Sequence, residues 1–197
     1  NGCESNPTTV TLEIYSLPLP PIATSQTACY GDPTPDLTAI GTNIKWYLDA
    51  GLTSLDGTGL SYSTGQTAPA IYTYYVTETD GNGCESNPTT VTLEIYSLPA
   101  SPNALNETVC FGDPAPDLVA TTGTNIKWYD ASFTTLLYSG SSYPTGQTNP
   151  GIYTYNVTQT DGNGCESNPT IVTLEIYDLP IANFTYTFQA GGGCGAG

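Results

Sequence analysis

One stretch of this chain, NGCESNPTTVTLEIYSLP, occurs three times and constrains the fold more than any other feature. Its copies begin at Asn1, Asn82 and Asn163, and the third is nearly unchanged from the others. The cysteine in this stretch therefore recurs every 81 residues, and a second cysteine type recurs at the same spacing. A fixed period of this length indicates a tandem array of one structural unit.

The period divides the 197-residue chain into two complete copies and two partial ends. We expect residues 1–18 to be the last strand of a preceding copy. Residues 19–99 are the first complete copy and residues 100–180 the second. Residues 181–197 break the pattern and are expected to begin a different β domain. We interpret the sequence as part of a longer protein whose targeting signals lie elsewhere.

Apolar and polar residues alternate through each copy, which predicts strands with one buried face. No segment has a helical period, so each copy is predicted to be all-β. Turn signals about every ten residues and a tryptophan in mid-copy favour tandem Greek-key β-sandwiches of the immunoglobulin type. The expected core residues include Trp46, Tyr72, Trp128 and Tyr153.

The charge balance is strongly acidic, with 18 Asp and Glu, two Lys, no Arg and no His, giving a net charge of −16. Nucleic acids and anionic membranes both require a basic face, so neither is an expected partner. No apolar run approaches the length of a membrane span, so we expect no membrane insertion in this segment. Without histidine or a nucleophile motif, the chain is not expected to be an enzyme.

Six cysteines in small, Gly- and Pro-rich units predict an oxidising compartment and disulfides. Pairing within a copy would join Cys29 to Cys84 and Cys110 to Cys165. In an immunoglobulin topology, however, Cys29 and Cys84 belong to opposite ends of the sandwich, so Cys29 could instead meet Cys165 of the next copy. We leave both pairings open. The candidate disulfide cysteines are Cys3, Cys29, Cys84, Cys110, Cys165 and Cys194.

Acidic turns provide weak candidates for calcium ligands, because hard cations prefer clustered oxygen atoms. Asp-Pro and Asp-Gly are also ordinary turn formers, so no cofactor is expected apart from this calcium. The candidate ligands are Asp32, Asp36, Asp80, Asp113, Asp117 and Asp161.

Three further expectations concern single side chains. The strand periodicity predicts that Lys45 and Lys127 point into solvent. Exposed tyrosines would favour an alternative function as a carbohydrate-binding module; the candidates are Tyr47, Tyr96 and Tyr129. Sequons mark candidate glycan sites at Asn106, Asn156 and Asn183.

The combination C-x-G-D-P, L-x-A, I-K-W-Y, Y-T-Y, G-N-G-C-E-S and V-T-L-E-I, which spans residues 1–180, resembles the immunoglobulin-like repeats of giant Bacteroidota surface adhesins. These adhesins are associated with gliding motility and are exported by the type 9 secretion system. The resemblance implies an extracellular filament anchored at the outer membrane. Its partners would be other repeats of the same chain and, through other parts of the protein, surface polysaccharide or the substratum. The stretch IANFTYTF is similar to the first strand of a PKD-like domain.

Overall fold

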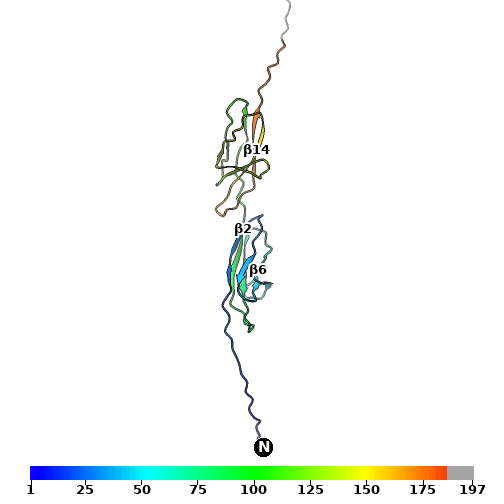
Figure 1. The fold of residues 1–197 in the computed structure, drawn as a ribbon, viewed down its shortest axis with the longest axis vertical. Coiled ribbons are helices and arrows are strands. Elements are labelled where there is room, and N and C mark those ends of the chain that lie inside the picture. The colour runs from blue at the N-terminus through cyan, green and yellow to red at the C-terminus, as the bar shows by residue number, and fades with distance from the viewer. Residues whose placement is uncertain (186–197) are drawn as a thin grey trace, which may run out of the picture. The chain divides into compact units, whose positions relative to one another are not determined.

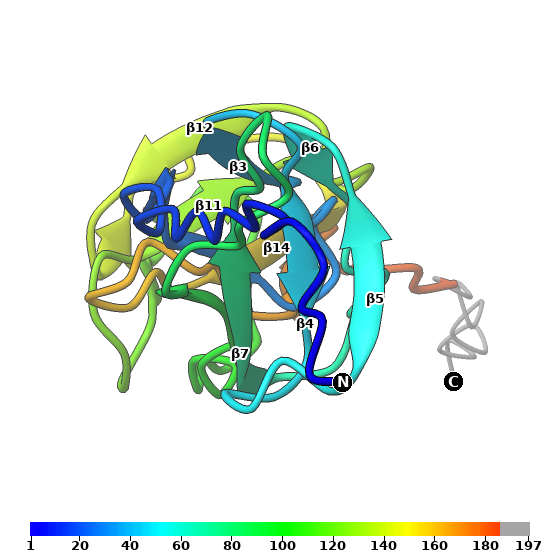
Figure 2. The same cartoon turned by 90° about the horizontal axis from the view of Figure 1, so that it is seen from below.

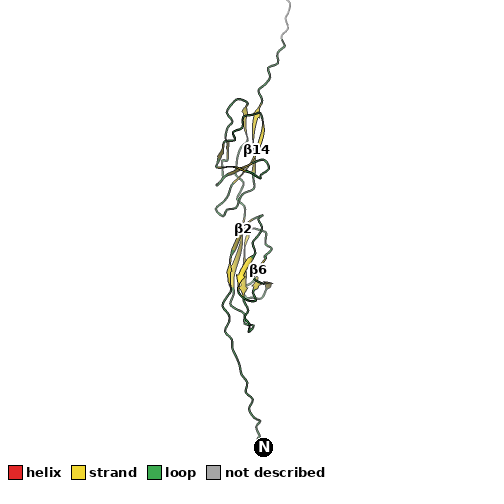
Figure 3. Ribbon diagram, in the orientation of Figure 1, coloured by secondary structure: helices red, strands yellow, loops and turns green. Residues whose placement is uncertain are grey.

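The computed structural model describes residues 1–185, which contain strands, turns and loops but no helix (Figure 1, Figure 3). In this part of the chain, then, no helix could cross a membrane. The residues form two compact units. The first comprises Asn1–Pro99 together with Gly162–Cys165, and the second contains Ala100–Asp161 and the chain from Glu166 onward. The short segment Gly162–Cys165 belongs by sequence to the second copy but groups with the first unit.

The first copy contains eight strands, all short except the last two. They are β1 (Ile22–Thr24), β2 (Gln26–Cys29), β3 (Leu37–Ile40), β4 (Lys45–Tyr47), β5 (Leu55–Thr58), β6 (Ser61–Tyr62), β7 (Ala70–Thr77) and β8 (Thr89–Tyr96). One sheet has the order β1-β3-β6 and the other the order β2-β8-β7-β4-β5. Figure 2 shows β7, β4 and β5 following one another across the larger sheet. This architecture confirms the predicted all-β fold.

The first β-segment of the copy crosses from one sheet to the other. Residues of β1 pair antiparallel with β3, whereas β2 pairs parallel with β8, in a register that places Cys29 opposite Tyr96. Ser25 lies between the two strands, and its hydroxyl accepts a hydrogen bond from the Thr92 amide at 3.0 Å. The segment therefore supplies one edge strand to each sheet. It also places Cys29 beside Tyr96, the last residue of β8.

The core lies between the two sheets and is built from inward residues of both. Trp46 is fully buried, its indole nitrogen donates to the Gly59 carbonyl at 2.9 Å, and its ring stacks on Tyr62. Tyr74 is also buried, whereas Tyr72 packs against the margin of the core and remains partly exposed. The other members of this core are Leu37, Ala39, Ile44, Val76, Val91, Leu93 and Ile95.

The second copy repeats the larger sheet and keeps fewer pairings in the smaller one. Its strands are β9 (Glu107–Cys110), β10 (Leu118–Val119), β11 (Lys127–Tyr129), β12 (Leu136–Ser139), β13 (Ser142–Tyr143), β14 (Gly151–Thr158) and β15 (Thr170–Tyr177). The sheets have the orders β10-β13 and β12-β11-β14-β15-β9. Trp128 is fully buried in this core, and Tyr153 packs at its margin as Tyr72 does in the first copy.

Residues at the two ends of the chain do not form the strands that their alternation predicts. Residues 1–20 contain no strand, and Val10 and Ile14 are 87% and 84% exposed. A strand needs a hydrogen-bonded neighbour, and this stretch has none among the described residues. Residues 181–185 also form no strand. The rest of the predicted C-terminal β domain, including Cys194, lies outside the described residues.

Candidate functional site: a disulfide between copies and the clamp behind it

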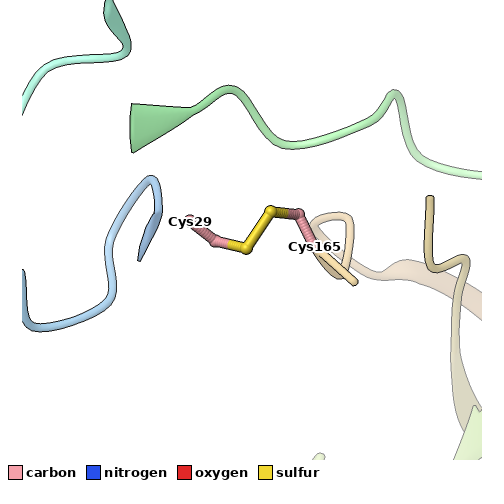
Figure 4. The surroundings of a disulfide bond; sticks show 2 residues. All are labelled: Cys29 and Cys165. Atoms are coloured by element: carbon pink, nitrogen blue, oxygen red, sulfur yellow. A yellow bond between two sulfur atoms is a disulfide. The ribbon is translucent and has the colours of Figure 1, made fainter. Parts of the chain in front are cut away.

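The most distinctive chemical feature of the chain is a disulfide between cysteines of different copies. Cys29, at the end of β2, is bonded to Cys165, in the loop between β14 and β15 (Figure 4). Their Cα atoms are 5.6 Å apart, within the usual range for a disulfide, and 136 residues separate them in the sequence. Cys165 has no exposed surface. The bond joins the first copy covalently to the second.

The sheet register explains why pairing within a copy does not occur. Cys29 lies opposite Tyr96, the last residue of β8, whereas Cys84 precedes Thr89, the first residue of that strand. A strand of this length spans roughly 23 Å at about 3.3 Å per residue. Disulfides require Cα atoms within about 7 Å. Of the two pairings left open by the sequence, Cys29 with Cys84 is therefore wrong.

Three cysteines in the described part of the chain remain thiols. Cys3 and Cys110 are exposed, and Cys84 is half-buried. In the sandwich, Cys110 has the same position as Cys29, because it ends β9 opposite Tyr177 of β15. Cys84 has the same hairpin position as Cys165. The thiols of Cys110 and Cys84 thus occupy, in the other copy, the positions of the bonded Cys29 and Cys165.

A tightly hydrogen-bonded hairpin presents Cys84, one of the cysteines of the repeated NGCES stretch. In the first copy, the Asp80 carboxylate accepts hydrogen bonds at 2.9 Å from the amides of Asn82 and Cys84. The Asp80 amide in turn donates to the Cys84 carbonyl at 3.1 Å, and Gly83 has a φ of +85°, which favours glycine. The second copy has Gly164 at φ +87° in the same place. The repeated DGNGC sequence therefore encodes a defined cysteine-bearing turn.

The residue after each of these cysteines anchors the hairpin to the larger sheet. The Glu85 carboxylate accepts hydrogen bonds from Lys45 Nζ at 2.9 Å, Tyr47 Oη at 2.7 Å and Thr77 Oγ1 at 2.6 Å. We call these four residues the Glu85 clamp. Backbone pairing of Thr79 with Glu85 adds to it. Because the donors come from β4 and β7, the clamp holds the base of the hairpin on the sheet.

The second copy contains the same arrangement around Glu166. This carboxylate accepts from Lys127 at 2.9 Å, Tyr129 at 2.7 Å and Thr158 at 2.5 Å. These four residues form the Glu166 clamp, and they fix the residue next to the bonded Cys165. The clamp therefore recurs in both copies with the same donors and nearly the same distances, so it is a feature of the repeat.

Burial and hydrogen bonding shift the pKa values of the clamp residues in opposite directions. Burial raises the pKa of Glu85, but the hydrogen bonds from Thr77, Tyr47 and Lys45 and the lysine charge outweigh it, so the pKa is lowered overall. The pKa of Glu166 is lowered in the same way. Burial and the hydrogen bond to its glutamate raise the pKa of Tyr47 to about 12, and that of Tyr129 likewise to about 12. In each clamp, the glutamate is therefore ionised near neutral pH, and the tyrosine that donates to it is neutral.

The clamps correct two expectations about exposed side chains. Lys45 and Lys127 do not extend freely into solvent, because each side chain is only 32% exposed and paired with a glutamate. Tyr47 is buried and Tyr129 half-buried, with both hydroxyl groups bound to the clamp. Residues on the outer face of β4 and β11 are covered by the hairpins, which periodicity alone does not reveal. Tyr47 therefore has almost no exposed ring on which a sugar could stack, and the exposed part of Tyr129 lies beside Phe133.

The candidate calcium ligands are dispersed over separate turns. Asp36 and Asp117 each accept a hydrogen bond from a serine, at 2.9 Å from Ser61 and 2.7 Å from Ser142. Asp80 is bound within its hairpin, and the amides of Asp32 and Asp113 close the turns after Cys29 and Cys110. Asp161 lies in the second copy's hairpin. Within residues 1–185, no three His, Cys, Asp or Glu side chains are grouped so that they could hold a metal ion.

One of the sequons lies at a position where a glycan does not fit. Asn156 is buried, and its amide nitrogen, the atom to which a glycan would attach, donates to the carbonyls of Asp130 at 2.8 Å and Ala131 at 3.2 Å. Asn106 also uses its side chain, which accepts from the Thr173 amide at 2.9 Å. Both asparagines act in the fold as hydrogen-bonding groups.

Comparison with known proteins identifies the repeat. A family model described as "Ig-like domain CHU_C associated" matches residues 18–96 and again residues 99–177. No curated protein matches the chain.

Several solved structures are similar to the chain at low identity. Fibronectin(III)-like modules of Clostridium thermocellum CbhA are 14% identical, with 84% of this chain and 96% of that chain covered and a TM-score of 0.43. Drosophila N-cadherin EC1-3 is 17% identical, with coverage of 83% and 66% and a TM-score of 0.29. A SusE-like surface-located polysaccharide-binding protein from Bacteroides thetaiotaomicron is 15% identical, with coverage of 80% and 34% and a TM-score of 0.30.

Proposed function

The chain belongs to the family of Ig-like domains described as CHU_C associated, and we propose that it is a stalk segment of a large extracellular bacterial surface adhesin. The stalk carries adhesive parts of the protein away from the cell. Its partners are other repeats of the same chain, and contact with surface polysaccharide or the substratum is made elsewhere. The adhesin serves gliding motility or surface attachment, is exported by type 9 secretion and is held at the outer-membrane surface.

The observation that carries this proposal is the covalent bond between Cys29 of one copy and Cys165 of the next. Successive copies are then joined twice, once by the peptide chain between them and once by sulfur. A second covalent connection restricts how far two domains can turn relative to each other, whereas a single linker leaves interdomain motion as the default. Restricted rotation is what a stalk needs and what a set of independent binding modules does not need.

Composition and disulfide chemistry support the same reading. A structural disulfide persists in an oxidising, extracytoplasmic compartment. A net charge of −16 keeps separate molecules apart and in solution. The acidic surface has two basic residues, and both are occupied in the clamps. The resemblance to Bacteroidota surface adhesins supports the assignment to gliding motility and type 9 secretion.

Single-molecule energy transfer between the two copies tests the stalk. Donor and acceptor dyes are placed by non-natural amino acids at Ile71 and Ile152, equivalent positions that are 64% and 67% exposed. The oxidised chain is expected to give one narrow distance distribution. A variant with Cys29→Ser and Cys165→Ser is expected to give a broad one.

Two outcomes would count against the stalk. Equally broad distributions in both proteins would mean that the disulfide is a loose tether. Specific binding of a polysaccharide by the oxidised chain would instead favour the carbohydrate-binding alternative. The labelled chain also carries serine at the other four cysteines, so that the only variable is the bond between Cys29 and Cys165.

A further inference from the structure

Two thiols occupy the same structural positions as the two bonded cysteines. Cys110 ends β9 as Cys29 ends β2, and the next residue donates its amide to the partner tyrosine carbonyl in both copies. The distances are 2.8 Å from Phe111 to Tyr177 and 2.9 Å from Tyr30 to Tyr96. The turn that follows is closed by the same hydrogen bond, with the Asp113 amide donating to the Cys110 carbonyl. Cys110 is exposed, so this position is open to a partner.

Cys84 matches the other member of the bond. It precedes the clamp glutamate, as Cys165 does, and the two clamps agree at each of their three contacts to within 0.1 Å. The hairpin that carries Cys84 is thus held in the form that already bonds in the second copy. Cys84 is half-buried and not bonded.

The last strand of each copy separates its two cysteines. One lies beside the final residue of β8 or β15, and the other precedes that strand. A copy therefore has one cysteine type at each end, and the two types pair between consecutive copies. Because Cys29 and Cys165 are already joined, the two complete copies have one thiol of each type left, Cys84 and Cys110. Cys3 has the sequence surroundings of Cys84 but lies outside both complete copies, in a stretch that forms no hairpin.

We propose that Cys110 and Cys84 are complementary half-sites for a further copy of this chain, with Cys110 of one molecule bonding to Cys84 of the next. The proposal rests on the proposed stalk, which it extends by naming the partner and the bond. The contact joins two different surfaces, so it is heterologous and propagates head to tail instead of closing into a dimer. On one long chain, the same pairing would join the Cys110-type cysteine of each copy to the Cys84-type cysteine of the next copy.

The bond forms by thiol–disulfide exchange with a small disulfide such as oxidised glutathione. One thiolate attacks the oxidant and releases one glutathione thiolate; the second thiolate then displaces the other glutathione. Two protein thiols lose two electrons and two protons, and one oxidised glutathione becomes two thiols. The chemistry needs no other reactant.

Charge explains why a covalent bond is the expected way to hold such molecules together. Each chain carries a net charge of −16, so copies repel one another in solution. Added salt screens this repulsion over about 8 Å at physiological ionic strength. We therefore expect the cross-linking rate to increase with salt concentration.

Mixing two single-thiol proteins tests the proposal. Both contain Cys3→Ser and Cys194→Ser; one adds Cys84→Ser and keeps Cys110, and the other adds Cys110→Ser and keeps Cys84. In a glutathione redox buffer, each protein alone is expected to stay monomeric on a non-reducing gel. An equimolar mixture is expected to give a single dimer, with Cys110 bonded to Cys84 in a peptide map.

The same experiment can overturn the proposal. Dimers of either protein alone, at a level equal to that in the mixture, would show unspecific oxidation. A mixture that stays monomeric, while its peptide map retains Cys29–Cys165 and both thiols react with an alkylating agent, would refute the complementary half-sites. That failure leaves the stalk untouched if the energy-transfer distribution of the oxidised chain remains narrow.

Discussion

At the scale of single residues, Glu85 and Glu166 do more for this repeat than their sequence position suggests. Each carboxylate joins a lysine, a tyrosine and a fully buried threonine from two strands to the cysteine-bearing hairpin. The sequence contained the signal, because CES and IKWY recur together. It could not be interpreted, since strand periodicity places Lys45 and Tyr47 on an outer face and does not show that a hairpin covers that face.

Replacing the clamp carboxylate is expected to destabilise the unit that contains it. Glu85→Ala leaves the Thr77 and Tyr47 hydroxyl groups buried without their acceptor, which costs about 1–3 kcal/mol of unfolding free energy. Urea titration in a Trp128→Phe background, where the fluorescence of Trp46 reports the first unit, measures the loss. Glu94→Ala, on the outward side of β8, is the control and should change stability by less than about 0.5 kcal/mol.

The lowered pKa of the same glutamate predicts an acid-sensitive stability. A carboxyl whose pKa is lower in the folded chain stabilises it fully above the usual value of 4.5, and this contribution is lost as the pH falls through the lowered folded pKa. Urea midpoints from pH 7 to pH 3 should therefore fall more for the wild type than for Glu85→Gln. Parallel curves for the two proteins would show that the clamp does not titrate with folding.

The raised pKa of Tyr47 gives the matching alkaline prediction. A neutral tyrosine that is favoured by folding contributes stability below its usual pKa of 10, and the contribution disappears as the pH rises through the folded value of about 12. Tyr47→Phe should flatten the decline of stability between pH 9 and pH 12, measured by the same urea titration. An unchanged slope would contradict the assignment.

At the scale of elements, the two copies differ in the residue that β5 or β12 places opposite the core tryptophan. Gly57 lies opposite Trp46, and a Cβ there would approach the Tyr62 ring to 2.6 Å. The second copy has Tyr138 opposite Trp128, and its Tyr143 is tilted at 35° to the tryptophan, compared with 18° for Tyr62 and Trp46. Gly57 thus leaves the space that the Tyr62 ring occupies beside Trp46.

Gly57→Ala is expected to displace Tyr62 from its stack and to cost about 1–3 kcal/mol, as overpacked cores do. The Trp46 fluorescence of the Trp128→Phe background provides both the unfolding curve and a spectral shift that reports the altered stack. Gly81→Ala is the matched control, because a Cβ at Gly81 meets nothing within 4 Å. Equal effects of the two substitutions would show that Tyr62 moves aside without cost.

Most of the strands could be predicted, and the failures have physical reasons. Strands β8 and β15 alternate buried and more exposed residues along most of their length, and Trp46 and Trp128 lie where a mid-copy tryptophan was expected. Strands β7 and β14 alternate less regularly, because their last residues are buried on both faces. Strands β5 and β6 lie in a Gly-, Ser- and Thr-rich stretch whose side chains carry little periodicity, so only pairing with β4 and β3 defines them. Residues 10–15 show the reverse, because a perfect pattern without a neighbouring strand forms no sheet.

Disulfide pairing was also beyond the sequence. Equal spacing of 81 residues fits a bond within a copy as well as one between copies. The decision depends on the length of β8, which separates Cys29 from Cys84, and on the parallel pairing of β2 with β8, which places Cys29 at the far end. Both facts belong to the sheet register and leave no trace in cysteine spacing.

At the scale of the whole molecule, the disulfide closes a covalent ring between two cysteines that are 136 positions apart in the sequence. A pull on the two chain ends passes from residue 29 through the sulfur atoms to residue 165, so residues 30–164 lie outside the path of the force. Force spectroscopy should therefore show no extension from this ring in the oxidised chain. Reduction, or Cys29→Ser, should add a contour length of about 450 Å, at roughly 3.3 Å per residue. The same gain with the bond intact would contradict this path.

Because of this ring, the redox state of one disulfide decides which residues bear tension. While the sulfur bridge holds, tension bypasses both buried tryptophans and most of each sandwich, and the chain behaves as a short tether. When a reductant breaks the disulfide, the same tension acts on the strands of both sandwiches. The sandwiches can then unfold, and the chain extends further under load. For the stalk proposed above, the redox state of this one bond therefore sets how far the chain extends under tension.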